Sequence, residues 1–286
     1  MIDGPTDERD GGGVSVADSS SAGWLDRAVR ALEVDGCVVV HNVLSGQLQQ
    51  SLREAMGVAQ TGIDRDIGRQ RLLAAKEIGV LRAPMSYDPR FYDLLALPQV
   101  LAILDATVSS TAILHLQNGL VLPPANNGRA DSQFQHSFHR DFPRHLNGYL
   151  ASINTIFAID DFNDHNGATL VVPGSHQLPA RPDETEMRLN ALPVVCPAGS
   201  MIVFDSTLWH AAGQNLSSAD RLAVNQQFTR SFVKQQLDYV RLLGDHVVAS
   251  LPQRTQQLLG WYTRVVTSLD EYYQPADRRL YRAGQG

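Results

Sequence analysis

Apolar residues recur at helical spacing in two stretches near the N-terminus. The first helical face is formed by Trp24, Leu25, Val29 and Leu32. This spacing predicts an amphipathic helix that ends near Gly36, and a second helix is predicted over residues 45–60. Between them, the short apolar run Cys37-Val-Val-Val-His41 predicts a strand. We expect these helices to form a layer that packs against a sheet.

Short apolar runs separated by turn residues dominate the central part of the chain. The predicted strands cover residues 111–122, 149–160, 169–172, 194–196, 201–204 and 221–228. Helical patterns return over residues 235–243 and 252–267. Many short strands flanked by helices are typical of a β-sandwich or a β-barrel. The sequence therefore predicts a mainly β protein, with a β core over about residues 111–232 and a helical layer at each end.

The first 21 residues differ in composition from the rest of the chain. They are rich in Gly, Ser and Asp, so they cannot bury enough apolar surface to offset the entropy lost on ordering. We therefore expect a disordered segment over residues 1–21. The remaining residues, 22–286, are predicted to form a single domain, because barrels of this length commonly fold as one unit.

Composition and charge narrow the classes of partner. Hydrophobic residues make up 43% of the chain and charged residues 19%, which is ordinary for a globular protein. The formal net charge is −6 and the pI about 5.8, so no basic field exists to attract nucleic acid. No apolar run is long enough to span a membrane, and the N-terminus does not resemble a signal peptide. Cys37 and Cys196 are too far apart in sequence for a zinc or redox pair, which weakly favours a cytoplasmic location.

The stretch from Gln133 to Phe142 contains a His-x-Asp pattern. If this stretch is a β-strand, His139 and Asp141 share one face while Arg140 points away, because side chains in a strand alternate. An imidazole and a carboxylate that converge are two thirds of the 2-His-1-carboxylate triad that binds non-heme Fe(II). A lone three-residue pattern is weak evidence, and a solvated surface strand is the simpler interpretation.

Two residues further along the chain strengthen the metal hypothesis. His210 follows another short apolar run and is the candidate third ligand. Arg221 comes eleven residues later and opens a run that alternates as a strand, in which Arg221, Ala223, Asn225 and Gln227 share a face. A guanidinium buried beside the metal would need an anionic partner, and its fork fits a carboxylate. The dicarboxylate 2-oxoglutarate would supply one.

With these residues in place, the chain resembles the phytanoyl-CoA hydroxylase-like (PhyH-type) family of Fe(II)/2-oxoglutarate-dependent oxygenases. The family pattern is His-x-Asp, then Asn-Gly followed by Pro-Gly-Ser-His, then a distal His with an Arg eleven residues later. In this sequence the pattern is found as His139-Arg-Asp141, Asn166-Gly through Pro-Gly-Ser-His176, His210 and Arg221. The match covers about residues 34–235.

The resemblance implies a fold, cofactors and site residues. The fold would be a double-stranded β-helix, the jelly-roll or cupin-like core, and His139, Asp141 and His210 would bind Fe(II). The co-substrates would be 2-oxoglutarate and O₂, with Arg221 as the anchor of 2-oxoglutarate. Gln117 and Asn154 match family positions that contact the co-substrate, although an ordinary polar role in a strand is an equal alternative.

The resemblance also bears on the reaction. Related halogenases have Gly or Ala where this chain has Asp141, so a carboxylate here favours hydroxylation of a small molecule, for instance in natural-product metabolism. Desaturation or ring formation by the same iron chemistry is an alternative, because the fold does not fix the outcome. A non-catalytic barrel that binds a ligand without turnover is another.

Substrate contacts are expected in three regions, namely the loop 121–133 as a candidate lid, residues 142–149 and the elements around residues 76–92. Arg140, Arg144 and His145 would favour an anionic group, unless they lie on a solvated surface. No pattern in these regions identifies the substrate, and none specifies an oligomeric state.

Overall fold

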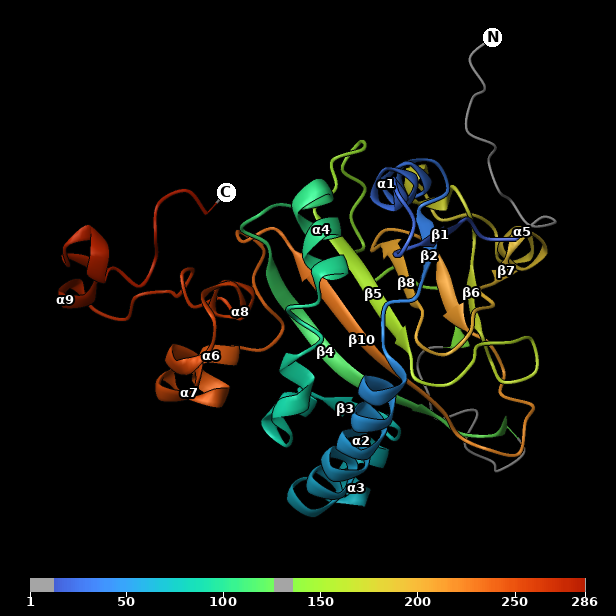
Figure 1. Cartoon of the computed structure of the whole chain (residues 1–286), viewed down its shortest axis with the longest axis horizontal. Coiled ribbons are helices and arrows are strands. Elements are labelled where there is room, and N and C mark those ends of the chain that lie inside the picture. The colour runs from blue at the N-terminus through green and yellow to red at the C-terminus, as the bar shows by residue number, and fades with distance from the viewer. Residues whose placement is uncertain (1–12, 126–135, 286) are drawn as a thin grey trace, which may run out of the picture.

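A large sheet and a small sheet form the centre of the protein in this computed structural model, which describes residues 13–125 and 136–285 (Figure 1). The seven strands of the large sheet lie in the order β1 (Val16–Asp18), β2 (Cys37–His41), β8 (Met201–Asp205), β5 (Ser152–Ala158), β10 (Arg221–Thr229), β4 (Ile113–Leu122) and β3 (Val80–Arg82). The small sheet has the order β7 (Leu192–Pro193), β6 (Thr169–Val171) and β9 (His210–Ala212). Neighbouring strands are antiparallel except β1 and β2.

The two faces of the large sheet bury different cores, because successive side chains of each strand point to opposite sides. On β10, Ala223 belongs to an apolar cluster between the sheets that includes Val171 of β6. Its neighbour Val224, with Phe228, belongs to the cluster on the other face, which the helices cover. The protein therefore has three layers, with the helices, the large sheet and the small sheet in that order.

The helical layer comes from both ends of the chain. Its N-terminal members are α1 (Trp24–Val34), α2 (Gly46–Asp66), α3 (Arg69–Ala74) and α4 (Pro98–Thr107). The C-terminal members are the short helices α6 (Tyr239–Leu243), α7 (Asp245–Ser250) and α8 (Gln253–Leu258). The helix α9 (Leu269–Tyr272) lies farther from the sheet and buries no residue, and α5 (Glu184–Asn190) lies beside the small sheet (Figure 1). Within the described ranges, no helix combines the length and the apolar character needed to cross a bilayer.

The predicted mainly β core with flanking helices is confirmed, but its extent differs from the prediction. The large sheet also includes β2 and β3, which precede residue 111. Residues 16–18, expected to be disordered, form β1, because the free edge of β2 offers backbone hydrogen bonds such as Val39 N to Ser15 O at 2.9 Å. The expectation for residues 1–12 lies outside the described part of the chain.

The turn before β6 brings two backbone segments into close contact at Gly167. This residue has φ of +80°, and a Cβ built on it would lie 2.7 Å from Leu122 Cδ2 and 2.9 Å from the Gly213 carbonyl oxygen. Gly174 has a similar φ of +76° but would have no atom within 4 Å of its Cβ. Both positions favour glycine because L-residues are strained there, but only Gly167 is also sterically closed.

We expect Gly167→Ala to lower the free energy of unfolding more than Gly174→Ala does. The second variant should cost about 1–2 kcal/mol for the left-handed backbone alone. The first should lose about 1–3 kcal/mol more, because backbone atoms must move to admit the methyl group. Urea denaturation of both variants measures the difference, and equal losses would show that the close contact at Gly167 is not a constraint.

Candidate active site

A pair of backbone hydrogen bonds joins the two histidines of the predicted triad. His139 N donates to His210 O at 3.0 Å, and His210 N donates to His139 O at 3.1 Å. This antiparallel bridge is isolated, so His139 does not lie in the regular strand that the sequence analysis expected. The chain bends directly after it, and Phe142 N donates to Ser206 O at 2.8 Å. The His-x-Asp segment is thus held against β9 and the end of β8 without forming a ladder of its own.

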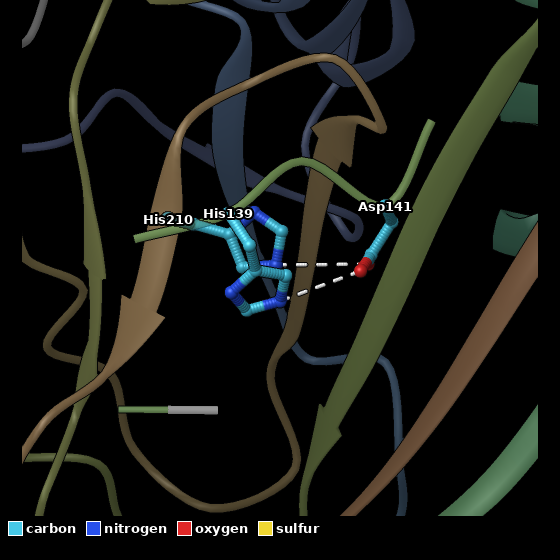
Figure 2. A group of neighbouring side chains, drawn as sticks. All are labelled: His139, Asp141 and His210. Atoms are coloured by element: carbon cyan, nitrogen blue, oxygen red, sulfur yellow. Dashed lines mark ion pairs between the residues drawn. The ribbon is translucent and has the colours of Figure 1, made fainter. Parts of the chain in front are cut away.

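The side chains of His139, Asp141 and His210 converge on one point (Figure 2). His139 Nε2 lies 3.4 Å from Asp141 Oδ1, and His210 Nε2 lies 3.6 Å from Asp141 Oδ2. The ligand atoms of all three residues lie within 4.8 Å of one another. The two imidazole rings are also close, with centroids 4.3 Å apart. The structure therefore brings together all three of the predicted metal ligands.

Hydrogen bonds to backbone carbonyls fix which nitrogen of each imidazole faces the centre. His139 Nδ1 lies 2.8 Å from Ser137 O, and His210 Nδ1 lies 2.9 Å from Leu208 O. A carbonyl oxygen only accepts, so each Nδ1 carries a proton and each Nε2 is the ring nitrogen that faces the centre. This outer hydrogen bond is the usual way in which proteins orient a histidine ligand.

Burial and neighbouring charges set the protonation states of the three candidate ligands. Desolvation lowers the pKa of His210 to about 4, so this imidazole is neutral at pH 7. The pKa of Asp141 is also lowered: burial works in the opposite direction, but the two histidines and Asn154 stabilise its charged form. His139 has a raised pKa because the hydrogen bond and the charge of Asp141 outweigh its burial. One carboxylate and two nitrogen donors are a donor set that suits Fe(II).

Arg140 is turned away from the centre, as the period of two predicted. Its Nη2 donates to Ser175 O at 2.8 Å and to Leu178 O at 2.7 Å. Its Cζ lies 4.9 Å from the centroid of the Trp209 ring, so it contacts the residue that precedes His210. The guanidinium therefore holds the irregular ligand segment in place and does not present a charge to a substrate at the metal.

Arg221 lies in the same pocket as the triad. Only 4% of its surface is exposed, and burial lowers its pKa to about 10, so it stays charged at pH 7. Its Nη1 donates to Gly167 O, and its Cζ lies 3.9 Å from the centroid of the Phe162 ring. Among the described residues it forms no salt bridge, and its Nε has no hydrogen-bond partner. The carboxylate of Asp160 instead pairs with Arg53.

One pocket joins the metal ligands to Arg221. Its lining consists of Leu120, His139, Asp141, Ile156, Thr169, Phe204, His210, Ala211, Ala212, Arg221 and Asn225. Its wall is mixed: the side chains of Leu120, Ile156, Phe204, Ala211 and Ala212 are apolar, and the metal ligands, Thr169, Arg221 and Asn225 are polar. Among the described residues, Asn225 Oδ1 has no hydrogen-bond partner. A ligand with a carboxylate at each end and a short apolar middle matches this arrangement. The sequence analysis placed Asn225 on the same strand face as Arg221, and both residues line the pocket.

The two further predicted co-substrate residues have different positions. Gln117 pairs with Gln226 of β10 and so lies on the helix-covered face, where its Nε2 donates to Phe91 O at 3.1 Å. The structure therefore does not bring Gln117 to the site, because in a strand a shift of one position reverses the face. Asn154 pairs with Gln227 and faces the metal side, where its Nδ2 donates to Ser206 Oγ at 2.9 Å.

The regions expected to contact substrate are only partly described. Residues 126–133 of the candidate lid lie outside the described residues. The 142–149 segment does not line the metal pocket; His145 to Leu150 line a separate pocket with parts of α1 and α4. The sequence analysis also missed the buried residues Ser152 and Ser206 behind Asp141, because nothing in their spacing marks them.

The comparisons with known proteins agree with this geometry. The family model for phytanoyl-CoA dioxygenase (PhyH) matches residues 32–223. An uncharacterized protein of Mycobacterium tuberculosis is 58% identical over 262 residues, which is 92% of this chain and 96% of that protein.

Two solved structures share the fold at low sequence identity. EctD from S. alaskensis, solved with 2-oxoglutarate and 5-hydroxyectoine, has a TM-score of 0.57 and 17% identity, over 71% of this chain and 75% of that chain. SnoN, a non-heme α-ketoglutarate-dependent epimerase from nogalamycin biosynthesis, has a TM-score of 0.53 and 21% identity, over 72% and 80% of the two chains.

The core is therefore the expected double-stranded β-helix with flanking helices. The family model covers more than half of the chain, and the His-Asp-His triad that the resemblance implied is present. The chain belongs to the phytanoyl-CoA dioxygenase (PhyH) family of Fe(II)- and 2-oxoglutarate-dependent dioxygenases.

Proposed function

We propose that this protein hydroxylates a small-molecule substrate with Fe(II), 2-oxoglutarate and O₂. The observation that carries the proposal is that one pocket contains a His-Asp-His triad and a buried guanidinium that has no acidic partner among the described residues. A metal-binding barrel without turnover would need the triad but not Arg221. A buried cation without an acidic partner is costly, so its presence favours a ligand that brings its own carboxylate.

The triad and Arg221 would bind different groups. His139, Asp141 and His210 would hold Fe(II), and three protein ligands leave room for two oxygens of 2-oxoglutarate and for O₂. Arg221 would pair with the remote carboxylate, oriented by the Gly167 carbonyl and the Phe162 ring. The iron would supply O₂ activation coupled to decarboxylation of 2-oxoglutarate to succinate. The apolar side chains of Leu120, Ile156 and Phe204 in the pocket wall would limit the access of water to that reaction.

The type of oxidation is a finer proposal than the family. Asp141 supplies a carboxylate at the position that halogenases leave open, which favours hydroxylation. Desaturation or ring formation remains the alternative, and the similarity to the epimerase SnoN adds epimerisation as another outcome. We also propose a role in natural-product metabolism and a cytoplasmic location, to which the free thiols Cys37 and Cys196 contribute only weak support.

Replacing Asp141 by Ala tests the triad. The wild type should release succinate only with Fe(II), 2-oxoglutarate and O₂, and Zn²⁺ should inhibit because it takes the same ligands without redox chemistry. Asp141→Ala should bind iron weakly and release no succinate above background. Asp164→Ala, which removes an exposed carboxylate, is the matched control and should behave as the wild type. Full iron content and full turnover in Asp141→Ala would contradict the assignment.

Replacing Arg221 separates the co-substrate anchor from the metal ligands. Removing one partner of a buried charge pair costs about 2–5 kcal/mol, so Arg221→Ala should lower 2-oxoglutarate affinity by at least about tenfold while iron affinity is retained. Arg221→Lys should recover part of the loss, since a point charge lacks the planar fork. The measurement is an anaerobic titration of the Fe(II) protein with 2-oxoglutarate, followed by the metal-to-ligand charge-transfer absorption.

Arg188→Ala, on the exposed side of α5, is the matched control for this titration and should leave 2-oxoglutarate affinity unchanged. Unchanged affinity in Arg221→Ala itself would mean that another cation holds the co-substrate.

A further inference from the structure

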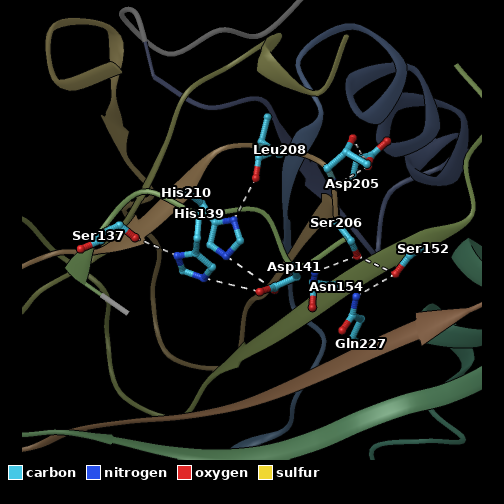
Figure 3. Close-up of polar contacts among 11 residues, drawn as sticks. Ser137, His139, Asp141, Ser152, Asn154, Asp205, Ser206, Leu208, His210 and Gln227 are labelled. Atoms are coloured by element: carbon cyan, nitrogen blue, oxygen red, sulfur yellow. Dashed lines mark hydrogen bonds and ion pairs between the residues drawn. The ribbon is translucent and has the colours of Figure 1, made fainter. Parts of the chain in front are cut away.

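A chain of buried polar side chains lies directly behind Asp141 (Figure 3). Asn154 Nδ2 donates to Ser206 Oγ at 2.9 Å, the Ser206 and Ser152 hydroxyls are 2.7 Å apart, and Gln227 Nε2 donates to Ser152 Oγ at 3.0 Å. None of these four side chains is more than 2% exposed. These hydrogen bonds connect β10, β5 and the turn after β8, and Asn154 lies beside Asp141.

Asp141 needs such support more than the two histidines do. Each imidazole is fixed by its own Nδ1 hydrogen bond to a carbonyl. Asp141 lies in a bend after an isolated bridge, so no ladder of strand hydrogen bonds fixes its backbone. The anchor that follows it is the hydrogen bond from Phe142 N to Ser206 O. Ser206 therefore touches the ligand segment through its carbonyl and the polar chain through its hydroxyl.

The Asn154 amide interacts with groups of the protein itself. A primary amide has two N–H donors. One points to Ser206 Oγ, and a side-chain hydrogen bond from Asn154 also lowers the pKa of Asp141. Asn154 does not line the pocket that contains Arg221. Its position therefore favours an interaction with Asp141 and Ser206 over the co-substrate contact that the resemblance implied.

We propose that Asn154 is a positioning residue, which holds the Asp141 carboxylate in its metal-binding orientation through the buried chain Ser206, Ser152 and Gln227. Buried hydrogen bonds in a low-dielectric environment hold a fixed geometry because no water competes for them. This inference rests on the proposed metal centre. It adds that metal affinity depends on residues that do not touch the metal.

The test is anaerobic titration of the full chain with Co(II), a spectroscopic substitute for Fe(II), followed by its visible absorption. Loss of an outer hydrogen bond to a metal ligand typically costs about 10–100-fold in metal affinity. Asn154→Ala should show a loss in that range and an altered Co(II) spectrum. Ser206→Ala, which removes one hydroxyl further from the ligand, should show a smaller loss.

The matched control is Thr155→Val on the same strand. Thr155 is also buried, but it faces the opposite side and its Oγ1 has no hydrogen-bond partner in the described part of the chain, so the change should leave metal affinity intact. Melting temperatures of all variants separate metal affinity from stability. If Asn154→Ala does not fold, Ser206→Ala decides the question.

Three outcomes would overturn the proposal. Metal affinity equal to that of the wild type in folded Asn154→Ala or Ser206→Ala would show that the polar chain is only structural. Lower 2-oxoglutarate affinity with unchanged metal affinity would make Asn154 a co-substrate contact instead. An equal loss of metal affinity in Thr155→Val would show a general effect of disturbing β5. A wild-type protein that binds no Co(II) or Fe(II) at all would refute the metal centre itself, which is a separate result.

Discussion

The reciprocal hydrogen bonds between the backbones of His139 and His210 are the contact on which the site depends. They join a segment without regular structure to a strand of the small sheet, and so place two imidazoles from distant parts of the sequence side by side. The third ligand, Asp141, follows from this placement because it lies two residues beyond the bridge. Arg140, which stacks on Trp209 and binds two carbonyl oxygens, secures the same segment from behind. The backbone bridge between His139 and His210 thus positions the three candidate ligands, and the contacts of Arg140 stabilise the segment that carries two of them.

Burial divides the pocket into two electrostatic environments. At the metal end, desolvation keeps His210 neutral while Asp141 stays charged, so the donors match a divalent cation. At the other end, Arg221 keeps its charge although it is buried, and the nearby Asp160 is paired with Arg53. A dianion that chelates a metal with one end and reaches a guanidinium with the other would compensate both ends together.

The alternation of side chains in strands made part of the site predictable. It placed Arg221 and Asn225 on one face and turned Arg140 away from the metal, and both placements are confirmed. The same rule could not place Gln117, because the face that a residue occupies depends on the pairing register with β10, which one sequence does not reveal. The contacts of Ser206 and Ser152 were equally hidden, since serines 54 residues apart meet only through the pairing of β5 with β8.

The most direct test of this account is an anaerobic crystal structure of the protein with Fe(II) and 2-oxoglutarate. We expect one iron bound by the Nε2 atoms of His139 and His210 and by the Asp141 carboxylate. The remote carboxylate of 2-oxoglutarate should form two hydrogen bonds with Arg221. Iron at any other set of residues, or a co-substrate whose remote carboxylate does not reach Arg221, would contradict the central claim that one pocket holds both.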